Sequence, residues 1–153
     1  MNRGISIVIP VFNESASLLQ LYEEIRKVTD SQDYDYEIIF VDDGSTDDSW
    51  LIIRGLAERD PRVKGVRFRR NFGKAAALMA GFSHTTKPFV MTMDADLQDD
   101  PAEIPNFLAE IDHGVDRVSG WKKIRHDPWH MVFPSRILNW LVGAITGVWL
   151  HDH

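Results

Sequence analysis

The sequence contains no cysteine, which excludes disulfides, thiolate metal sites and a cysteine nucleophile. Basic residues are few, 17 against 23 acidic ones, and the net charge of −6 argues against a general attraction to nucleic acid. Repeats, low-complexity segments and linkers are also missing. Hydrophobic residues make up 44% of the chain, enough for a core, so we expect a single globular domain over residues 1–153.

No segment has the character of a signal peptide or of a membrane-spanning helix. The first residues, MNRGISIVIPVFNE, lack a long apolar core and a small-residue cleavage site. The apolar stretch at residues 137–150 is too short to cross a hydrocarbon layer of roughly 30 Å. We therefore expect a cytoplasmic protein.

Short apolar runs typical of buried parallel strands alternate with amphipathic stretches typical of helices. Strands are predicted at residues 5–12, 36–41, 63–68 and 88–93. Helices are predicted at residues 18–28, at 74–82 and from about Asp100 to Gly114, with Pro105 fitting only near the start of the last one. Another helix is predicted between the second and third strands, after a turn in which Ser45 and Asp48 resemble a capping box. This order predicts an α/β fold, a Rossmann-like, mostly parallel sheet flanked by helices.

Polar clusters follow each predicted strand. They read PVFNE, DDGSTD, RRNFGK and DADLQDD in chain order. Ligands of open parallel sheets bind at the carboxyl ends of the strands, so we expect the clusters to meet at one edge of the sheet.

Asp94 and Asp96 lie just past the fourth strand, separated by one small residue. Carboxylates with this spacing can turn toward a common point, and Gln98 can add a neutral oxygen, which is the ligand chemistry of Mg²⁺ or Mn²⁺. Two or three protein oxygens leave coordination positions for a substrate diphosphate. The alternative is that the aspartates only cap a turn, but their place beside the other polar clusters favours a metal site.

Residues after the other strands suit a nucleotide. Phe12 offers a ring to a base, and Glu14 can accept from a base N–H group or can be a solvated residue at the start of the first helix. Asp42 and Asp43 are ambiguous, because at least one of them can be an acid at a helix N-terminus. The turn after the third strand combines cations with the free N–H groups of a helix start, which suits phosphates. Its candidate residues are Arg70, Asn71, Gly73 and Lys74.

The segment WKKIRHDPWH combines cations with Trp121 and Trp129. Such a combination suits an amphipathic molecule that carries a phosphate at a membrane edge, and the alternative is a solvated loop with two partly buried tryptophans. Residues 137–150 either pack on the core or lie at a membrane interface through Trp140 and Trp149. The sequence leaves both choices open.

Six motifs follow one another along the chain: IPVFNES, VDDGSTDDS, RNFGKAAALMAGF, MDADLQDDP, SGWKKIRHDP and PSRILNWLVGAITGVWLHD. Together they resemble the N-terminal part of family 2 glycosyltransferases of the GT-A fold, and more narrowly polyprenyl-phosphate hexosyltransferases of the dolichyl-phosphate mannose synthase type. The resemblance implies metal-dependent, inverting transfer of a hexosyl unit from a nucleoside-diphosphate sugar to dolichyl or undecaprenyl phosphate. It places the protein at the cytoplasmic face of a membrane.

The resemblance also implies roles for individual residues. For the nucleotide these are Pro10, Phe12, Glu14, Asp42, Asp43 and Ser45. For the metal and the catalytic step they are Asp94 and Asp96, with Gln98 as a further metal ligand. For the acceptor phosphate they are Lys122, Lys123, Arg125 and Arg136.

The chain stops at LHDH, where the catalytic domain of this family usually continues, so we expect a truncated domain. An alternative is therefore a nucleotide- and metal-binding module without turnover. A second, less favoured alternative is a Mg²⁺-dependent phosphohydrolase with Asp94 as nucleophile and Asp96 as acid. An uncovered apolar helix near the end predicts self-association into a homo-oligomer. The sequence leaves the sugar, the base (uridine or guanosine) and the metal open.

Overall fold

The computed structural model describes residues 4–112 and 117–119. The elements, in chain order, are β1 Gly4–Val11, α1 Leu18–Ser31, β2 Asp35–Asp42, α2 Ser49–Arg59, β3 Val63–Arg67, α3 Lys74–Phe82, β4 Phe89–Thr92, the 3-10 turn η1 Pro101–Glu103 and α4 Ile104–Asp112. The chain divides into two units, Met1–Ala109 and Glu110–His153. The sheet lies in the first unit, and the expectation of a single domain over the whole chain stays a prediction.

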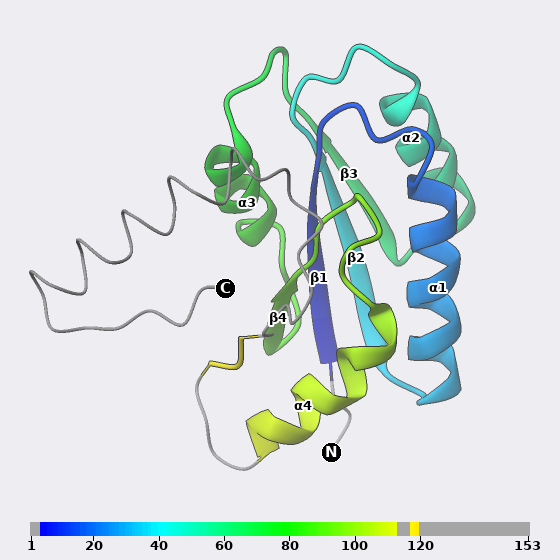
Figure 1. Ribbon diagram of the computed structural model, residues 1–153, viewed down its shortest axis with the longest axis vertical. Coiled ribbons are helices and arrows are strands. Elements are labelled where there is room, and N and C mark those ends of the chain that lie inside the picture. The colour runs from blue at the N-terminus through cyan, green and yellow to red at the C-terminus, as the bar shows by residue number, and fades with distance from the viewer. Residues whose placement is uncertain (1–3, 113–116, 120–153) are drawn as a thin grey trace, which may run out of the picture. The chain divides into compact units, whose positions relative to one another are not determined.

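The four strands form one parallel sheet in the order β3-β2-β1-β4. On β1, Ile5 pairs with Tyr36 of β2 on one side and with Phe89 of β4 on the other. Helices α1 and α2 cover one face of the sheet and α3 covers the opposite face (Figure 1). This arrangement confirms the predicted parallel α/β architecture and brings the carboxyl ends of all four strands to one edge.

The core follows from the two-residue period of the strands. Paired residues share a face, so Val8 of β1 lies beside Ile39 of β2 and packs with Val41 and Ala77 under α3. The alternate residues of the two strands, including Ile7 and Ile9 on β1 and Ile38 and Phe40 on β2, are fully buried and belong to the other face. Each such side chain contributes about 1.5–3 kcal/mol when buried.

Helix α3 has the predicted bounds, α1 runs three residues beyond the predicted range, and the helix predicted from about Asp100 begins as the 3-10 turn η1 and becomes α-helical at Ile104. The predicted capping box is wrong, because the N-cap of α2 is Asp48, which makes no side-chain cap hydrogen bond, and Ser45 lies outside the helix. Before α4, Asp100 accepts a hydrogen bond from the Ala102 N–H at 2.9 Å and caps η1. Pro105 is the second residue of α4, where its missing N–H group costs no helical hydrogen bond.

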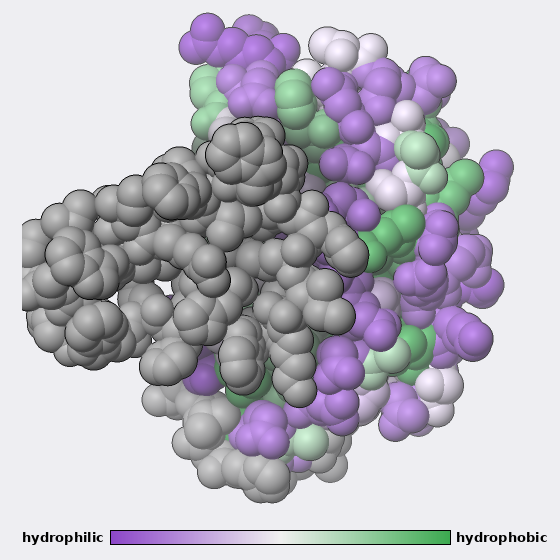
Figure 2. Space-filling view, in the orientation of Figure 1, coloured by the Kyte–Doolittle hydropathy of each residue, from purple (hydrophilic) through white to green (hydrophobic). Residues whose placement is uncertain are grey.

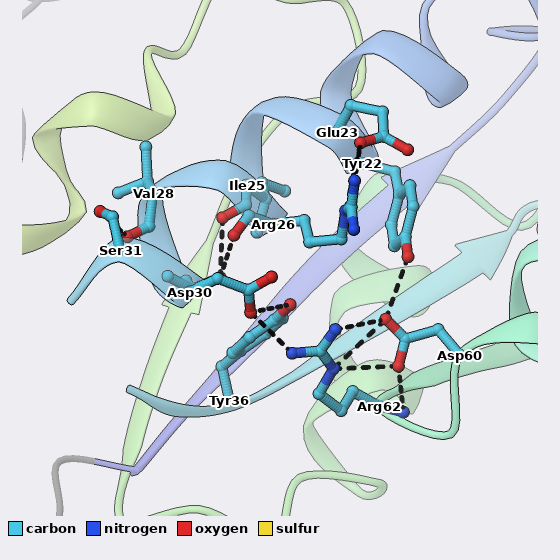
Figure 3. A network of polar contacts seen from close by, with 11 residues as sticks. Tyr22, Glu23, Ile25, Arg26, Val28, Asp30, Ser31, Tyr36, Asp60 and Arg62 are labelled. Carbon is cyan, nitrogen blue, oxygen red and sulfur yellow. Dashed lines mark hydrogen bonds and ion pairs between the residues drawn. The ribbon is translucent and has the colours of Figure 1, made fainter. Parts of the chain in front are cut away.

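A polar network joins α1, β2 and the turn before β3 at the amino edge of the sheet (Figure 3). The Arg62 guanidinium contacts Asp60 at 2.9 Å and Asp30 at 2.8 Å, and it lies 4.4 Å from the Tyr36 ring centroid. Tyr22 donates its hydroxyl to Asp60 at 3.0 Å. The hydrogen bonds from Arg62, opposed by burial, lower the pKa of Asp60 to about 2. The network therefore ties α1 to the start of β3 through ionised groups.

A second polar cluster crosses the same edge on the α3 face. The buried carboxylate of Glu37 on β2 accepts from Ser6 of β1 at 2.6 Å, from Lys64 of β3 at 2.7 Å and from the backbone N–H of Thr86 at 2.7 Å. Burial alone would raise the pKa of Glu37, but the hydrogen bonds from Lys64, Ser6 and Thr86 outweigh it and lower the pKa to about 2. Glu37 thus links three strands and the loop before β4.

Hydrophilic residues dominate the coloured surface in Figure 2, with hydrophobic residues scattered among them. Among the described residues, the exposed large hydrophobic side chains are Phe12, Leu19, Leu51, Phe72, Met79, Phe82 and Val90. No helix in residues 4–112 or 117–119 is long and apolar enough to cross a membrane. The 137–150 segment lies outside the described residues, so packing on the core and lying at a membrane interface both stay predictions for it.

Candidate active site

A cavity of about 340 Å³ lies at the carboxyl edge of the sheet. Its volume is at the lower end of the range of small-molecule sites, about 300–1,000 Å³. The loops after all four strands contribute to it, through Pro10, Val11, Phe12, Glu14, Asp43, Asn71, Gly73, Lys74, Asp94, Ala95 and Asp96. The expected meeting of polar clusters at one edge is therefore confirmed. Four predicted site residues, Asp42, Ser45, Arg70 and Gln98, are not among these lining residues.

Backbone-to-side-chain hydrogen bonds join the loop after β1 to the loop after β2. The N–H groups of Asn13 and Glu14 donate to the hydroxyls of Ser45 and Ser49 at 2.9 and 3.0 Å. In return, the Asn13 side chain accepts from the Thr46 N–H at 2.8 Å. These contacts position the part of the cavity wall that carries Phe12 and Glu14. The Ser45 hydroxyl thus bonds to the protein backbone and does not line the cavity.

Asp47 strengthens this junction from the second loop. Its carboxylate accepts from the N–H groups of Ser15 and Ser49, both at 3.0 Å. Burial alone would raise the pKa of Asp47, but the hydrogen bonds from Ser49 and Ser15 together outweigh it and hold that pKa well below its usual range. The carboxylate therefore stays ionised and keeps both N–H groups satisfied.

Asp42 and Asp43 point to opposite faces of the sheet because they are consecutive at the end of β2. Asp42 is fully buried, accepts from the Ser45 N–H at 3.0 Å, and pairs with Arg67, whose guanidinium lies 5.4 Å from the Trp50 ring centroid. Its second carboxylate oxygen lies 3.3 Å from Arg67 Nε without a hydrogen bond among the described residues. Asp42 thus lies on the α2 side, away from the cavity that Asp43 lines.

Asp43 holds the loop between β3 and α3. Its two carboxylate oxygens accept from the N–H groups of Phe72 at 2.7 Å and Gly73 at 2.9 Å. Gly73 has a φ of 93°, which a residue with a side chain rarely adopts, and it is followed directly by Lys74 at the start of α3. Asp43 therefore sets where α3 begins at the cavity.

Gly44 allows the loops after β2 and β3 to touch. Its φ is 73°, and a Cβ atom at this position would lie 2.4 Å from the carbonyl carbon of Arg70. Any side chain would therefore push the two loops apart. Asn71 lines the cavity, whereas the Arg70 guanidinium lies 5.0 Å from the Phe72 ring centroid, in a cation–π contact.

Asp94 and Asp96 lie on the cavity wall formed by the loop after β4. Asp94 pairs with Lys74 at 2.5 Å, and its N–H donates to Asp99 at 2.8 Å. Asp96 accepts from the Gln98 N–H at 3.1 Å, across Leu97 with a φ of 63°. The loop is therefore a tight turn that presents both predicted metal ligands, while Gln98 takes part through its backbone.

No group of three or more histidine, aspartate or glutamate side chains in the described residues is placed to hold a metal ion alone. The pair Asp94 and Asp96 nevertheless fits a divalent cation that shares its coordination with a diphosphate. It offers hard oxygen ligands on a cavity wall, and it already attracts one cation, the Lys74 ammonium group.

Sequence reasoning missed the residues that join the first two loops, namely Asn13, Asp47 and Ser49. One signal was available, because asparagine is among the residues that tolerate a positive φ, and Asn13 has a φ of 58°. The pairing itself joins residues 32 to 35 positions apart, which no local pattern reveals. The predicted acceptor residues, Lys122, Lys123, Arg125 and Arg136, lie outside the described residues.

Three comparisons with known proteins fit this geometry. The model of the family described as "Glycosyl transferase family 2" matches residues 6–144. A curated relative, "Undecaprenyl-phosphate 4-deoxy-4-formamido-L-arabinose transferase" from Shewanella sediminis, is 43% identical over 97% of this chain and 45% of its own length. The chain thus spans about 45% of the length of that relative.

Solved structures show the same fold. TarS from S. aureus has a TM-score of 0.64 at 22% identity, covering 84% of this chain and 39% of TarS. The mannosyltransferase PcManGT from Pyrobaculum calidifontis, solved with GDP-Man and Mn²⁺, has a TM-score of 0.53 at 30% identity over 61% of this chain and 27% of its own. These likenesses confirm the predicted GT-A fold. With the match over residues 6–144, they establish that the chain belongs to glycosyl transferase family 2.

Proposed function

We propose that this chain provides the donor site of a polyprenyl-phosphate glycosyltransferase. The cavity would bind a nucleoside-diphosphate sugar with Mg²⁺ or Mn²⁺, and the sugar would pass with inversion to a lipid phosphate. One observation carries the proposal: in a chain of this family, Asp94 and Asp96 line the same cavity as Phe12, Asp43 and Lys74.

The nucleoside would lie against the walls after β1 and β2. Phe12 is 46% exposed in the cavity and offers its ring to a base. Asp43 lines the cavity although it is only 3% exposed, and each of its oxygens accepts one backbone N–H and keeps a second lone pair that a base N–H would use. Glu14 lines the same wall and offers a further acceptor. These groups suit uracil and guanine, which both present N–H donors.

The diphosphate would lie between α3 and the loop after β4. The N-terminus of α3 carries no side-chain cap, and Lys74 is its first residue. Asp94 and Asp96 would hold the divalent cation, which neutralises the charge of the departing diphosphate when bound. The acceptor phosphate is already an anion, so the chain need not supply a general base to activate it.

The acceptor and the sugar follow from the relatives. The curated relative is named for undecaprenyl phosphate and for a derivative of arabinose, which is a pentose. We therefore propose a polyprenyl phosphate as acceptor and widen the expected hexosyl unit to a glycosyl unit. A lipid acceptor requires a membrane surface, so we place the protein at the cytoplasmic face of a membrane.

Calorimetric titration of the 153-residue chain with UDP and with GDP, each with and without Mn²⁺, tests the donor site. We expect binding of one nucleotide that depends on the metal. No binding of either nucleotide in Mn²⁺ would overturn the proposal. Transfer of a radiolabelled sugar to undecaprenyl phosphate then separates a transferase from a module that binds the donor without turnover.

A further inference from the structure

We propose that Lys74 is an exchangeable counter-ion: it occupies Asp94 while the divalent cation is absent, and it moves to the donor diphosphate when the cation takes its place. This inference rests on the donor site proposed above. The observation behind it is the ion pair between Lys74 and Asp94.

The starting contact is the ion pair across the cavity. Lys74 Nζ lies 2.5 Å from Asp94 Oδ1, and both residues line the cavity beside Pro10 and Val11 of β1 and Phe12 of the loop after β1. The pair thus joins α3 to the loop after β4. The ammonium group therefore occupies a carboxylate oxygen that Asp94 would need to coordinate a metal ion.

The backbone that carries Lys74 is held independently of the ion pair. Asp43 accepts from the N–H groups of Phe72 and Gly73, the two residues before Lys74. The long Lys74 side chain is 60% exposed and has flexible torsions, so its ammonium group can move while the start of α3 stays in place. The mobile part of the exchange is therefore the side chain alone.

The ion pair is weak enough to exchange. The Asp94 side chain is 32% exposed, and pairs of such exposure contribute little, so competition from Lys74 weakens metal binding by up to about five-fold. A divalent cation on Asp94 repels the ammonium group at short range. The donor diphosphate, which the same cation would bind, offers the displaced lysine a new anionic partner, and lysine binds phosphate as a point charge.

Lys74→Gln tests the exchange, with Lys87→Gln as its matched control. Lys87 also forms a lysine–aspartate pair, with Asp35 at 2.6 Å, but at the amino edge of the sheet and away from the cavity. Both variants remove one positive charge. Free Mn²⁺ is followed by electron paramagnetic resonance in titrations without nucleotide, and nucleotide binding is then measured by calorimetry in saturating Mn²⁺.

We expect Lys74→Gln to bind Mn²⁺ about two- to five-fold more tightly than the wild type and the nucleotide about ten-fold more weakly. Lys74→Arg should restore nucleotide binding, and Lys87→Gln should match the wild type in both titrations. The opposite signs of the two effects are the signature of exchange, because a merely structural role of Lys74 would weaken both ligands together.

Two outcomes separate this inference from the proposed function. If the wild type binds Mn²⁺ and a nucleotide but Lys74→Gln has unchanged or weaker Mn²⁺ affinity, the exchange is wrong and the donor site stands. If the wild type binds neither ligand, the proposed function is overturned and the exchange falls with it.

Discussion

Single residues at the site differ in role even when they are neighbours in the chain. Asp42 is buried against Arg67, whereas Asp43 lines the cavity and holds Phe72 and Gly73. Asp43 accepts one backbone N–H on each of its two oxygens, whereas an asparagine amide has a single acceptor oxygen and would leave one of these donors unsatisfied. Each aspartate of the site therefore has its own expected effect on mutation.

Asp96→Asn should abolish metal-dependent nucleotide binding and leave the fold intact. The Asp96 side chain is exposed on the cavity wall, and the Gln98 N–H, which donates to it, can donate equally to an amide oxygen. Asparagine, however, lacks the charge that a divalent cation requires. Calorimetry with the nucleotide in Mn²⁺ measures the loss, and circular dichroism checks the fold.

Asp33→Asn is the matched control, because Asp33 is exposed in the turn after α1 with a φ of 53°, which asparagine tolerates. It should bind the nucleotide as the wild type does. Unchanged affinity of Asp96→Asn in Mn²⁺ would remove the metal assignment.

Individual site residues could be predicted from the sequence where a side chain able to bind a ligand directly follows a predicted strand. Asp94 and Asp96 follow a strand and were expected at the cavity, where the structure places them. The choice between Asp42 and Asp43 was beyond prediction, because it depends on the register of β2 against β1. The role of Ser45 was likewise hidden, since its partner Asn13 lies 32 positions away.

Helix α3 is the element that most directly couples the core to the cavity. Its first residue carries the ammonium group at the site, and its eighth, Gly81, lies against the sheet, where a Cβ atom would be 2.3 Å from Val8 Cγ1. Any shift of α3 away from the sheet would therefore move Lys74 as well.

Gly81→Ala should lower the free energy of unfolding by about 1–3 kcal/mol through overpacking against Val8. The same change at Gly55 in α2 meets nothing within 4 Å and should raise it by up to about 1 kcal/mol, because alanine favours helix. Urea denaturation measures both changes. Equal effects of the two substitutions would show that α3 does not pack closely on β1.

Element boundaries were predictable where local signals suffice. The alanine-rich stretch at residues 74–82 has high helix propensity and forms α3 over the expected range. The start of α2 was not predictable in this way, because Ser45, which was expected to cap it, instead accepts a hydrogen bond from Asn13 in the loop after β1. Tertiary contacts thus override local capping at the site itself.

At the scale of the whole molecule, the ionic networks around Glu37 and Arg62 lie at the edge of the sheet opposite the cavity. Glu37, Asp60 and Arg62 link strands and helices at the amino edge, while the cavity lies at the carboxyl edge. Acid should therefore weaken the amino edge through Glu37 and Asp60, and it should also weaken the junction of the two loops that Asp47 holds at the carboxyl edge.

The stability that Glu37 and Asp60 contribute should be fully present above about pH 5 and should be lost as the pH drops toward 2. The pKa values of Glu37 and Asp60 are about 2 in the folded protein, below their ordinary values of 4.5 and 3.8, so the unfolded chain takes up protons first. Glu37→Gln should cost about 2 kcal/mol at pH 7 and flatten this slope. Urea midpoints between pH 7 and pH 2 measure both.

Asp35→Asn is the control for this series, since its pair with Lys87 is 45% exposed on the aspartate side. It should keep the wild-type slope. A slope in Glu37→Gln as steep as that of the wild type would assign acid unfolding to other carboxylates.

The architecture of the whole molecule was largely predictable, because strands alternate with helices and the motifs of the chain occur in family order. Networks such as that around Glu37 were not, because they join residues from β1, β3 and the loop before β4 that are far apart in sequence. Buried polar contacts depend on the three-dimensional register that the hydrophobic pattern leaves undefined.

The strand order β3-β2-β1-β4 also has a consequence for the time course of folding. Strands β1, β2 and β3 pair in the order in which a ribosome releases them, but β4 must return across α3 to reach β1, where Ile5 meets Phe89. Closing so long a loop is slow compared with local pairing. We therefore expect the nucleoside walls to form early during synthesis, and the two aspartates after β4 to complete the site last.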